Sequence, residues 1–354
     1  MTVSNADGAC DPVPSCTTFL QPLKPMNRRN LIALLGGAAA AWPLAARAQR
    51  ANQMRRVGVL MGLAESDPEG QERFTAFRNH LQKLGWSEGS NIRVVTRWAG
   101  GDIARTRAYA AELVGLAPDV ILVNTPPGLV ALQAATRSIP IVFVQVVDAA
   151  EGVVNSPARP GGNATGFFTF FEYSMAGKWL QMLKEVATRV KRVAALQNSQ
   201  HPAWSRYLDT LRSVAPALGI EVVAAGVQEP AEIERVIGQF ARKPNGGLIV
   251  LPDTFTTVHR GLIVQVAARY RLPSIGQSKA FTTAGGMMSY GADLADLLRQ
   301  AALYVDSILR GEKPAELPVQ ASTKFELVLN RKTAKTLGVT IPLAMLLRAD
   351  HVID

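Results

Sequence analysis

The feature that most constrains the fold is a regular alternation of short apolar runs with amphipathic stretches of helical spacing. Residues 56–62 form the first apolar run, and Phe74, Phe77 and Leu81 recur after it along one helix face. The unit then repeats, and residues 141–146 form another short run rich in β-branched residues. Strands that alternate with helices need crossover connections, so the pattern predicts an α/β fold with doubly wound, mainly parallel sheets.

A cluster of proline and glycine interrupts the alternation midway, and a second strand and helix series of similar size follows it. The chain has 354 residues, which is enough for two cores, since domains commonly hold about 100 to 200 residues. We therefore predict two lobes joined by a multi-strand hinge, with a ligand cleft between them. The first lobe is predicted to hold residues 55–164 plus 288–319, and the second residues 165–287 plus 320–354. The glycines of the interruptions are the predicted hinge positions: Gly161, Gly162, Gly166 and Gly286.

Residues 1–48 precede the first strand and are assigned to an upstream extension and an export signal. After Met26 come the basic pair Arg28 and Arg29, an apolar segment and small residues up to Ala48. The apolar segment is shorter than the roughly 20 residues that cross a bilayer as a helix. The order is typical of a signal peptide, so we predict a true start at Met26, cleavage after Ala48 and a periplasmic protein. The export route stays open between the twin-arginine and general secretory pathways.

Composition narrows the possible partners. Cys10 and Cys16 both precede the predicted cleavage point, so the mature chain is expected to form no disulfide. The formal net charge is +10, but the basic residues are scattered along the helices without a run. We expect a solvated basic surface and no nucleic-acid partner.

Motifs for catalysis are missing from the sequence. It contains no Gly-x-Ser-x-Gly elbow, no phosphate loop, no Gly-x-Gly-x-x-Gly after the first strand and no His-Glu-x-x-His. The histidines occur singly at separated positions. We predict no enzymatic activity, no metal and no cofactor. An enzyme that uses Asp67 or Asp253 as a base is the less favoured alternative.

Polar residues instead gather where the expected strands end. In parallel sheets these ends share one edge, toward which the following helices direct their N-terminal N–H groups, so the edge suits an anionic group. The same residue types also serve as helix caps, each worth about 1 kcal/mol. Their recurrence in both series favours a ligand cleft. The candidate ligand-binding residues are Ser66, Asp67, Thr125, Gln145, Asp148, Asn198, His201, Asp253, Thr254 and Ser278.

Several longer segments carry a family resemblance. They are Arg-Arg-Val-Gly-Val-Leu at the start of the mature chain, Pro-Gly-Gly-Asn-Ala-Thr-Gly at 160–166, Gly-Ala-Asp-Leu-Ala-Asp-Leu-Leu-Arg-Gln-Ala-Ala at 291–302, Ile-Leu-Arg-Gly-Glu-Lys-Pro-Ala-Glu-Leu-Pro-Val-Gln at 308–320 and Ala-Lys-Thr-Leu-Gly-Val-Thr-Ile-Pro at 334–342. Together they resemble the ABC-transporter substrate-binding proteins related to tryptophan/tyrosine-binding proteins.

The resemblance implies a type I periplasmic-binding-protein fold and a monomeric solute-binding component of an ABC importer. Such a protein binds a small molecule between its lobes and delivers it to a membrane permease with its ATPase. The resemblance does not fix the ligand, which we expect to be an amino acid or other small carboxylate. A periplasmic ligand sensor for a membrane receptor is the alternative. By position, Thr125 and the turn after it match the site of the ligand carboxylate. The positions that match the adjacent loop are Gln145 and Asp148, and those that match the closing second lobe are Asn198, Asp253 and Ser278.

Overall fold

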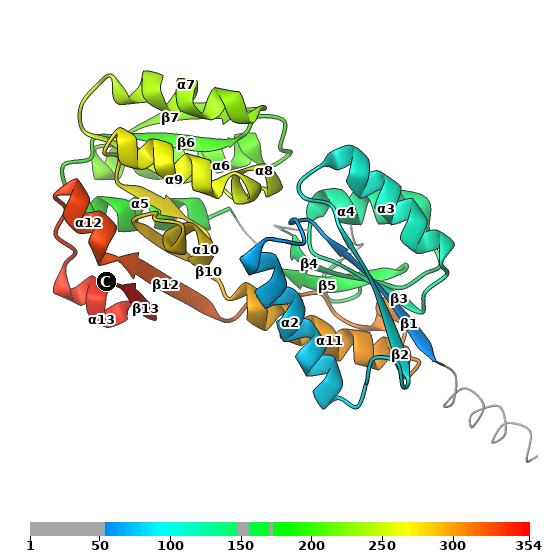
Figure 1. Cartoon of the computed structure of the whole chain (residues 1–354). Coiled ribbons are helices and arrows are strands. Elements are labelled where there is room, and N and C mark those ends of the chain that lie inside the picture. Colours follow the sequence, from blue (N-terminus) through cyan, green and yellow to red (C-terminus); the bar gives the residue numbers. More distant parts are fainter. Residues whose placement is uncertain (1–53, 147–155, 170–172) are drawn as a thin grey trace, which may run out of the picture. The chain divides into compact units, whose positions relative to one another are not determined.

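The computed structural model describes residues 54–146, 156–169 and 173–354. These residues form two mainly parallel β-sheets flanked by helices (Figure 1). The predicted α/β class, with two lobes, is confirmed.

The first lobe contains a six-stranded parallel sheet in the order β11-β5-β4-β3-β1-β2. Helices α2 and α11 pack on one face of this sheet, and α3 and α4 pack on the other. Its strands are β1 (Arg55–Met61), β2 (Ile92–Trp98), β3 (Val120–Val123), β4 (Ile141–Val146), β5 (Ala164–Phe168) and β11 (Gln320–Ala321). Its helices are α2 (Pro68–Lys83), α3 (Ile103–Gly115), α4 (Pro126–Ala135), α11 (Leu294–Leu309) and the 3-10 helix η2 (Pro314–Glu316).

The second lobe contains a seven-stranded sheet in the order β13-β12-β10-β9-β8-β6-β7, in which only the β10–β12 pair is antiparallel. Helices α5, α6, α12 and α13 pack on one face, and α7, α9 and α10 pack on the other. Its strands are β6 (Arg192–Asn198), β7 (Glu221–Val227), β8 (Gly246–Val250), β9 (Ser274–Gly276), β10 (Met288–Ala292), β12 (Phe325–Asn330) and β13 (His351–Ile353). Its helices are α5 (Met175–Val186), α6 (Trp204–Val214), α7 (Pro230–Ala241), α8 (Thr254–Val258), α9 (Arg260–Arg269), α10 (Lys279–Thr283), α12 (Arg331–Leu337), α13 (Leu343–Arg348) and the 3-10 helix η1 (Ala215–Leu218).

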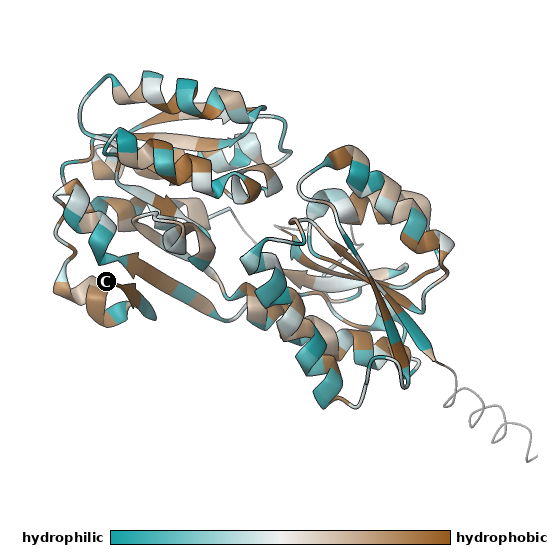
Figure 2. Ribbon diagram, in the orientation of Figure 1, coloured by the Kyte–Doolittle hydropathy of each residue, from teal (hydrophilic) through white to brown (hydrophobic). Residues whose placement is uncertain are grey.

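Helices on both faces explain why the central strands have continuous apolar sequences. Every residue of β3 is buried, as is usual for a parallel strand covered on both sides. Helix α2 buries Phe77 and Leu81 against the sheet, and the rest of this helix carries many hydrophilic residues (Figure 2). The continuous apolar runs of the strands and the 3.6-residue periodicity of the helices therefore follow from which faces are covered.

The chain crosses between the lobes after β5, between β10 and α11, and between β11 and β12. Two of these crossings are bonded to each other. The Asp293 N–H donates to the carbonyl oxygen of Lys324 (3.0 Å), and the Lys324 ammonium lies 2.8 Å from the Asp293 carboxylate. Neighbouring chain segments thus reinforce one another where the lobes connect.

The sheet order corrects the predicted lobe boundaries by one strand at each crossing. Strands β5 and β11, which the sequence placed largely in the second lobe, pair with each other in the first sheet. Strand β10, predicted to begin the return to the first lobe, belongs to the second sheet. A short apolar strand has the same composition in either sheet, so composition does not reveal its partner.

The predicted hinge glycines also lie away from the crossings. Gly161 and Gly162, with φ of 63° and 71°, form the turn that leads into β5. Gly166 lies inside β5, where a Cβ would come within 1.9 Å of the carbonyl oxygen of Phe143. Gly286 lies between α10 and β10 of the second lobe, where a Cβ would come within 2.3 Å of the Phe281 ring. These glycines are required by turns and close packing inside the lobes.

Candidate ligand-binding site

A pocket lies at the carboxyl ends of strands from both sheets, where open α/β folds place their ligands. Its empty space is about 490 Å³, counted with the part open to solvent. The first-lobe wall consists of Gly62, Leu63, Arg73, Asn124, Thr125, Pro126, Gln145 and Thr169. The second-lobe wall consists of His201, Pro252, Asp253, Thr254, Thr257 and Gln277.

The structure brings only some of the candidate residues to this pocket. Those that line it are Thr125, Gln145, His201, Asp253 and Thr254. Those that do not line it are Ser66, Asp67, Asn198 and Ser278. Asp148 lies outside the described residues.

Two of the residues outside the pocket have supporting contacts. The Asn198 N–H donates to the carboxylate of Asp253 (2.8 Å). Asp67 caps helix α2 by accepting from the N–H groups of Glu69 (3.0 Å) and Gly70 (3.4 Å). Ser278 lines a separate cavity, one that also includes Arg73 and Arg260.

Arg73 also lines the pocket, although it was not among the residues predicted from the sequence. It is 2% exposed and lies on the buried face of α2, one turn before Phe77. Its Nη1 donates to Gln145 Oε1 (2.9 Å), and its Nη2 forms an ion pair with Glu69. Its Nε has no hydrogen-bond partner among the described residues. In the sequence, Arg73 falls on the apolar stripe of the helix. A cation on a buried face needs polar partners, so such a position indicates a polar site.

Gln145 reaches this position through an irregularity in the sheet. The β4–β5 register shifts between Phe143 and Val146, and Gln145 has φ of 61°. A left-handed conformation is unfavourable for a residue with a Cβ and is commonly found at functional sites. The bulge lets the Gln145 side chain accept from Arg73 at the end of the strand.

Asn124 and Thr169 add unpaired polar atoms to the first-lobe wall. Asn124 is 1% exposed, and its Oδ1 accepts from the Gly62 N–H (2.8 Å). That bond identifies the other atom of the amide as Nδ2, which has no partner in the described part of the chain. Thr169 is 2% exposed, and its Oγ1 likewise has no partner there.

The sequence suggested an anion site at Thr125, formed by the N–H groups of the helix that follows. The N-terminus of α4 does not offer these groups. The first two helical residues are Pro126 and Pro127, which have no N–H group. The next N–H, of Gly128, donates to Thr125 Oγ1 (3.3 Å). Thr125 therefore acts as a helix cap, and the N–H groups usually offered by a first helical turn are absent or occupied.

Asp253 supplies a buried carboxylate to the second-lobe wall. It caps α8 by accepting from the Thr256 N–H (2.5 Å), and it is 9% exposed. Burial raises the pKa of Asp253 to about 6, although hydrogen bonds from the N–H groups of Thr256 and Asn198 oppose the shift. The carboxylate is mainly ionised at neutral pH and has a strong preference for a nearby positive charge.

His201 lies in the same wall as a neutral side chain. Burial lowers the pKa of His201 to about 4. Its Nδ1 accepts from the Ala203 N–H (3.2 Å), which leaves the proton of the neutral ring on Nε2. Through its Nε2–H group, His201 can donate a hydrogen bond in the pocket without adding charge near neutral pH.

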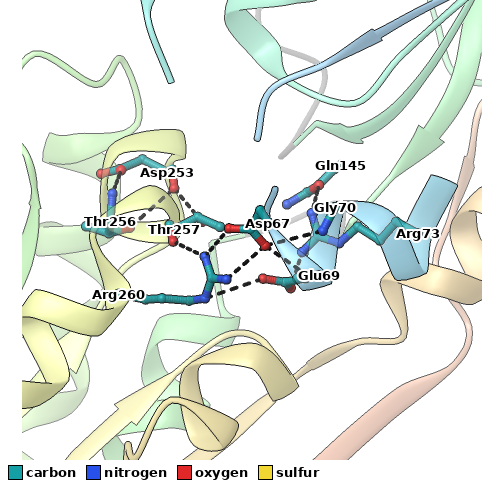
Figure 3. A network of polar contacts seen from close by, with 9 residues as sticks. All are labelled: Asp67, Glu69, Gly70, Arg73, Gln145, Asp253, Thr256, Thr257 and Arg260. Carbon is teal, nitrogen blue, oxygen red and sulfur yellow. Dashed lines mark hydrogen bonds and ion pairs between the residues drawn. The ribbon is translucent and has the colours of Figure 1, made fainter. Parts of the chain in front are cut away.

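A polar network connects the two walls (Figure 3). Arg260 of α9 donates to Asp67 of the first lobe (2.9 Å), with a second N–O distance of 2.8 Å. Arg260 also donates to the carbonyl oxygen of Thr257 (2.8 Å), and the Thr257 hydroxyl donates to the carbonyl oxygen of Asp253 (2.7 Å). On the other side, the Arg260 Nε lies 4.0 Å from Glu69, the ion-pair partner of Arg73.

The arrangement is suited to holding a small polar molecule from two sides. Among the described residues, no group of three or more His, Cys, Asp or Glu could hold a metal ion. No helix within residues 54–146, 156–169 and 173–354 is long and apolar enough to cross a membrane.

Comparison with known proteins shows the family. A sequence model described as "ABC transporter substrate binding protein" matches residues 61–353. The chain belongs to the ABC transporter substrate binding protein family. Its two-lobed α/β architecture is that of the type I periplasmic binding proteins. Proteins of this family bind small molecules for transport.

Individual relatives agree with this assignment. The chain is 26% identical to a tyrosine-binding protein of Clostridioides difficile over 264 residues, covering 74% of this chain and 75% of that protein. A conserved domain protein of Vibrio cholerae has a similar structure, with a TM-score of 0.78 and 28% identity over 85% of this chain and all of that one. An ABC domain of Streptococcus pneumoniae solved with L-Trp has a TM-score of 0.77 at 23% identity, with 85% and 100% of the two chains covered.

Proposed function

We propose that this substrate-binding protein takes a small zwitterion, an α-amino acid, as its ligand. The observation that carries the proposal is a buried arginine, Arg73, in the first-lobe wall and a buried aspartate, Asp253, in the second-lobe wall. A carboxylate is attracted to the arginine and an ammonium to the aspartate. A ligand that carries both groups contacts both lobes.

Relatives support the amino-acid class, since one is named a tyrosine-binding protein and another was solved with L-Trp. The described pocket lining contains no Phe, Tyr or Trp. Stacking on an aromatic ring is a common way to select an aromatic ligand. We therefore extend the proposal to amino acids in general and do not restrict it to aromatic ones.

The proposal includes a site of action and partners. The segment ending at Ala48 directs export, the mature protein acts in the periplasm as a monomer, and it delivers its ligand to an ABC permease with its ATPase. It performs no catalysis and needs no cofactor. Mass spectrometry of the exported protein is expected to give an N-terminus at Gln49, whereas precursor peptides that begin before Met26 would contradict the proposed start.

Titration calorimetry of the purified mature chain against the standard amino acids tests the ligand class. We expect saturable binding of one or a few amino acids. At a ligand concentration of 100 times Kd, binding should add about 2.7 kcal/mol to the free energy of unfolding. Binding of sugars or polyols in preference to every amino acid would contradict the proposal.

A further inference from the structure

The first-lobe wall contains several buried polar atoms without partners. The atoms are Arg73 Nε, Asn124 Nδ2 and Thr169 Oγ1, and all belong to residues that line the pocket. A buried polar group without a partner costs about 1 to 3 kcal/mol, and native proteins rarely retain one without a reason. Their gathering in one wall indicates that a ligand completes their hydrogen bonds.

The chemistry of these atoms defines that ligand group. Arg73 Nε and Asn124 Nδ2 are donors only, and the Thr169 hydroxyl can also donate. A group that accepts several hydrogen bonds within a small space, and that gains from an adjacent cation, matches this set. A carboxylate has these properties.

We propose that Arg73, Asn124 and Thr169 form the subsite that binds the ligand carboxylate and so determine the charge of the ligand. This inference rests on the proposed function, because it assumes that a small ligand occupies the pocket. It replaces the N-terminus of α4 as the carboxylate site, since Pro126 and Pro127 lack N–H groups there.

The contacts of Arg73 further limit the ligand to a single negative charge. Its Nη2 is paired with Glu69 and its Nη1 with Gln145, and its Nε is the guanidinium nitrogen that has no partner in the described residues. The Glu69 carboxylate also offsets the charge of the guanidinium, and its Oε2 is buried without a hydrogen-bond partner in the described residues. A dianion such as phosphate would bring a second negative charge close to Glu69, where the other nearby cation, Arg260, is already paired with Asp67. The subsite therefore selects carboxylates over phosphate.

Three substitutions test the subsite. Asn124→Asp retains the oxygen that accepts from the Gly62 N–H but replaces the donor Nδ2 with a second carboxylate oxygen. Thr169→Val removes the hydroxyl at nearly constant volume. Arg73→Gln removes the cation but leaves Glu69 without its ion-pair partner, so the first two variants provide the test if this one fails to fold. Arg78→Gln is the matched control, because Arg78 lies on the exposed face of the same helix.

The first pair of probes is L-tyrosine and tyramine, which lacks the carboxylate. The second probe is sodium acetate, compared with sodium chloride and sodium phosphate at equal ionic strength. We expect each subsite variant to weaken L-tyrosine binding by about 10- to 100-fold, the effect of losing a charge-assisted hydrogen bond. Tyramine binding and the control variant should be unaffected. Acetate should raise the unfolding temperature of the wild-type protein, more than phosphate does, and should lose this effect in the variants.

The outcomes separate the subsite from the proposed ligand class. If no amino acid binds but acetate stabilises the wild type and not the variants, the amino-acid proposal fails and the carboxylate subsite stands. If the variants bind L-tyrosine and acetate as the wild type does, the subsite is wrong. It is also wrong if neither acetate nor any amino acid binds the wild type.

Discussion

Ligand binding is expected to depend on the protonation state of the Asp253 carboxylate in the second-lobe wall. Burial raises its pKa to about 6 in the ligand-free protein. A ligand ammonium beside the carboxylate stabilises the charged form and lowers this pKa on binding. Binding must then release a proton whenever Asp253 is protonated in the free protein.

We therefore expect the affinity for an amino acid to be constant near neutral pH, where the ligand ammonium is charged, and to fall as the pH drops below about 6. The Asp253→Asn variant should lose this pH dependence and bind about 10- to 100-fold more weakly near neutral pH. His201 does not interfere, because its pKa of about 4 keeps it neutral over this range. Calorimetry in buffers of different ionisation enthalpy measures both the affinity and the released proton.

The matched control is Asp209→Asn, which changes an exposed aspartate on α6. It should retain the wild-type affinity and pH profile. An affinity that increases on acidification, or an Asp253→Asn variant with an unchanged pH profile, would remove Asp253 from the ligand site.

At the scale of elements, helices α2 and α9 join the two lobes through Asp67 and Arg260. The side chains are 14% and 15% exposed, so solvent screens this pair less than it screens a surface pair. Burial acts to raise the pKa of Asp67, but the hydrogen bond and charge of Arg260 and the N–H groups of α2 outweigh it and lower the pKa. The pair stays ionised over the pH range in which Asp253 titrates, so the two effects are separable.

Loss of this ion pair should reduce the population of molecules in which both walls contact the ligand. We expect Asp67→Asn and Arg260→Gln each to weaken amino-acid binding by about five- to tenfold, as for a partly buried pair worth roughly 1 kcal/mol. The double variant should be little weaker than either single variant, since both remove one interaction. Small-angle scattering of the ligand-free variants should show a larger radius of gyration.

The control pair is Glu234 and Arg269, which form an exposed ion pair between α7 and α9 inside the second lobe. Substitution of this pair should change neither the affinity nor the radius of gyration. Additive losses in the Asp67 and Arg260 variants, or an unchanged radius of gyration, would show that the interlobe pair does not set the lobe arrangement.

Most elements of the fold could be predicted because their signals are local. The strand of residues 141–146 and the helix carrying Phe77 and Leu81 follow from periodicity alone. Which sheet receives a short strand such as β5 depends on contacts that composition does not encode. Part of the pocket lining follows from the same local signals, since the strand-end residues Thr125 and Asp253 both line it.

Arg73 was missed because its position in the pocket depends on the packing of a helix face. The signal was present, since an arginine four residues before Phe77 falls on the buried face of α2. The predicted role of Thr125 overlooked the effect of Pro126 and Pro127, which remove N–H groups that a helix start normally offers. The contact of Asp67 with Arg260 joins segments far apart in the chain and has no local signal.

At the scale of the whole molecule, contacts from both lobes give a ligand the means to shift an equilibrium between open and closed arrangements. A ligand held by one wall alone would add stability without favouring closure, because it would bind both arrangements equally well. Closure on binding therefore requires a ligand that contacts Arg73 and Asp253 at the same time.

A crystal structure of the mature protein with its best-binding amino acid tests this claim most directly. We expect the ligand carboxylate to lie within hydrogen-bond distance of Arg73 Nε and Asn124 Nδ2, and the ligand ammonium to lie beside the Asp253 carboxylate. A ligand that contacts only one lobe, or that lies outside the pocket, would contradict it.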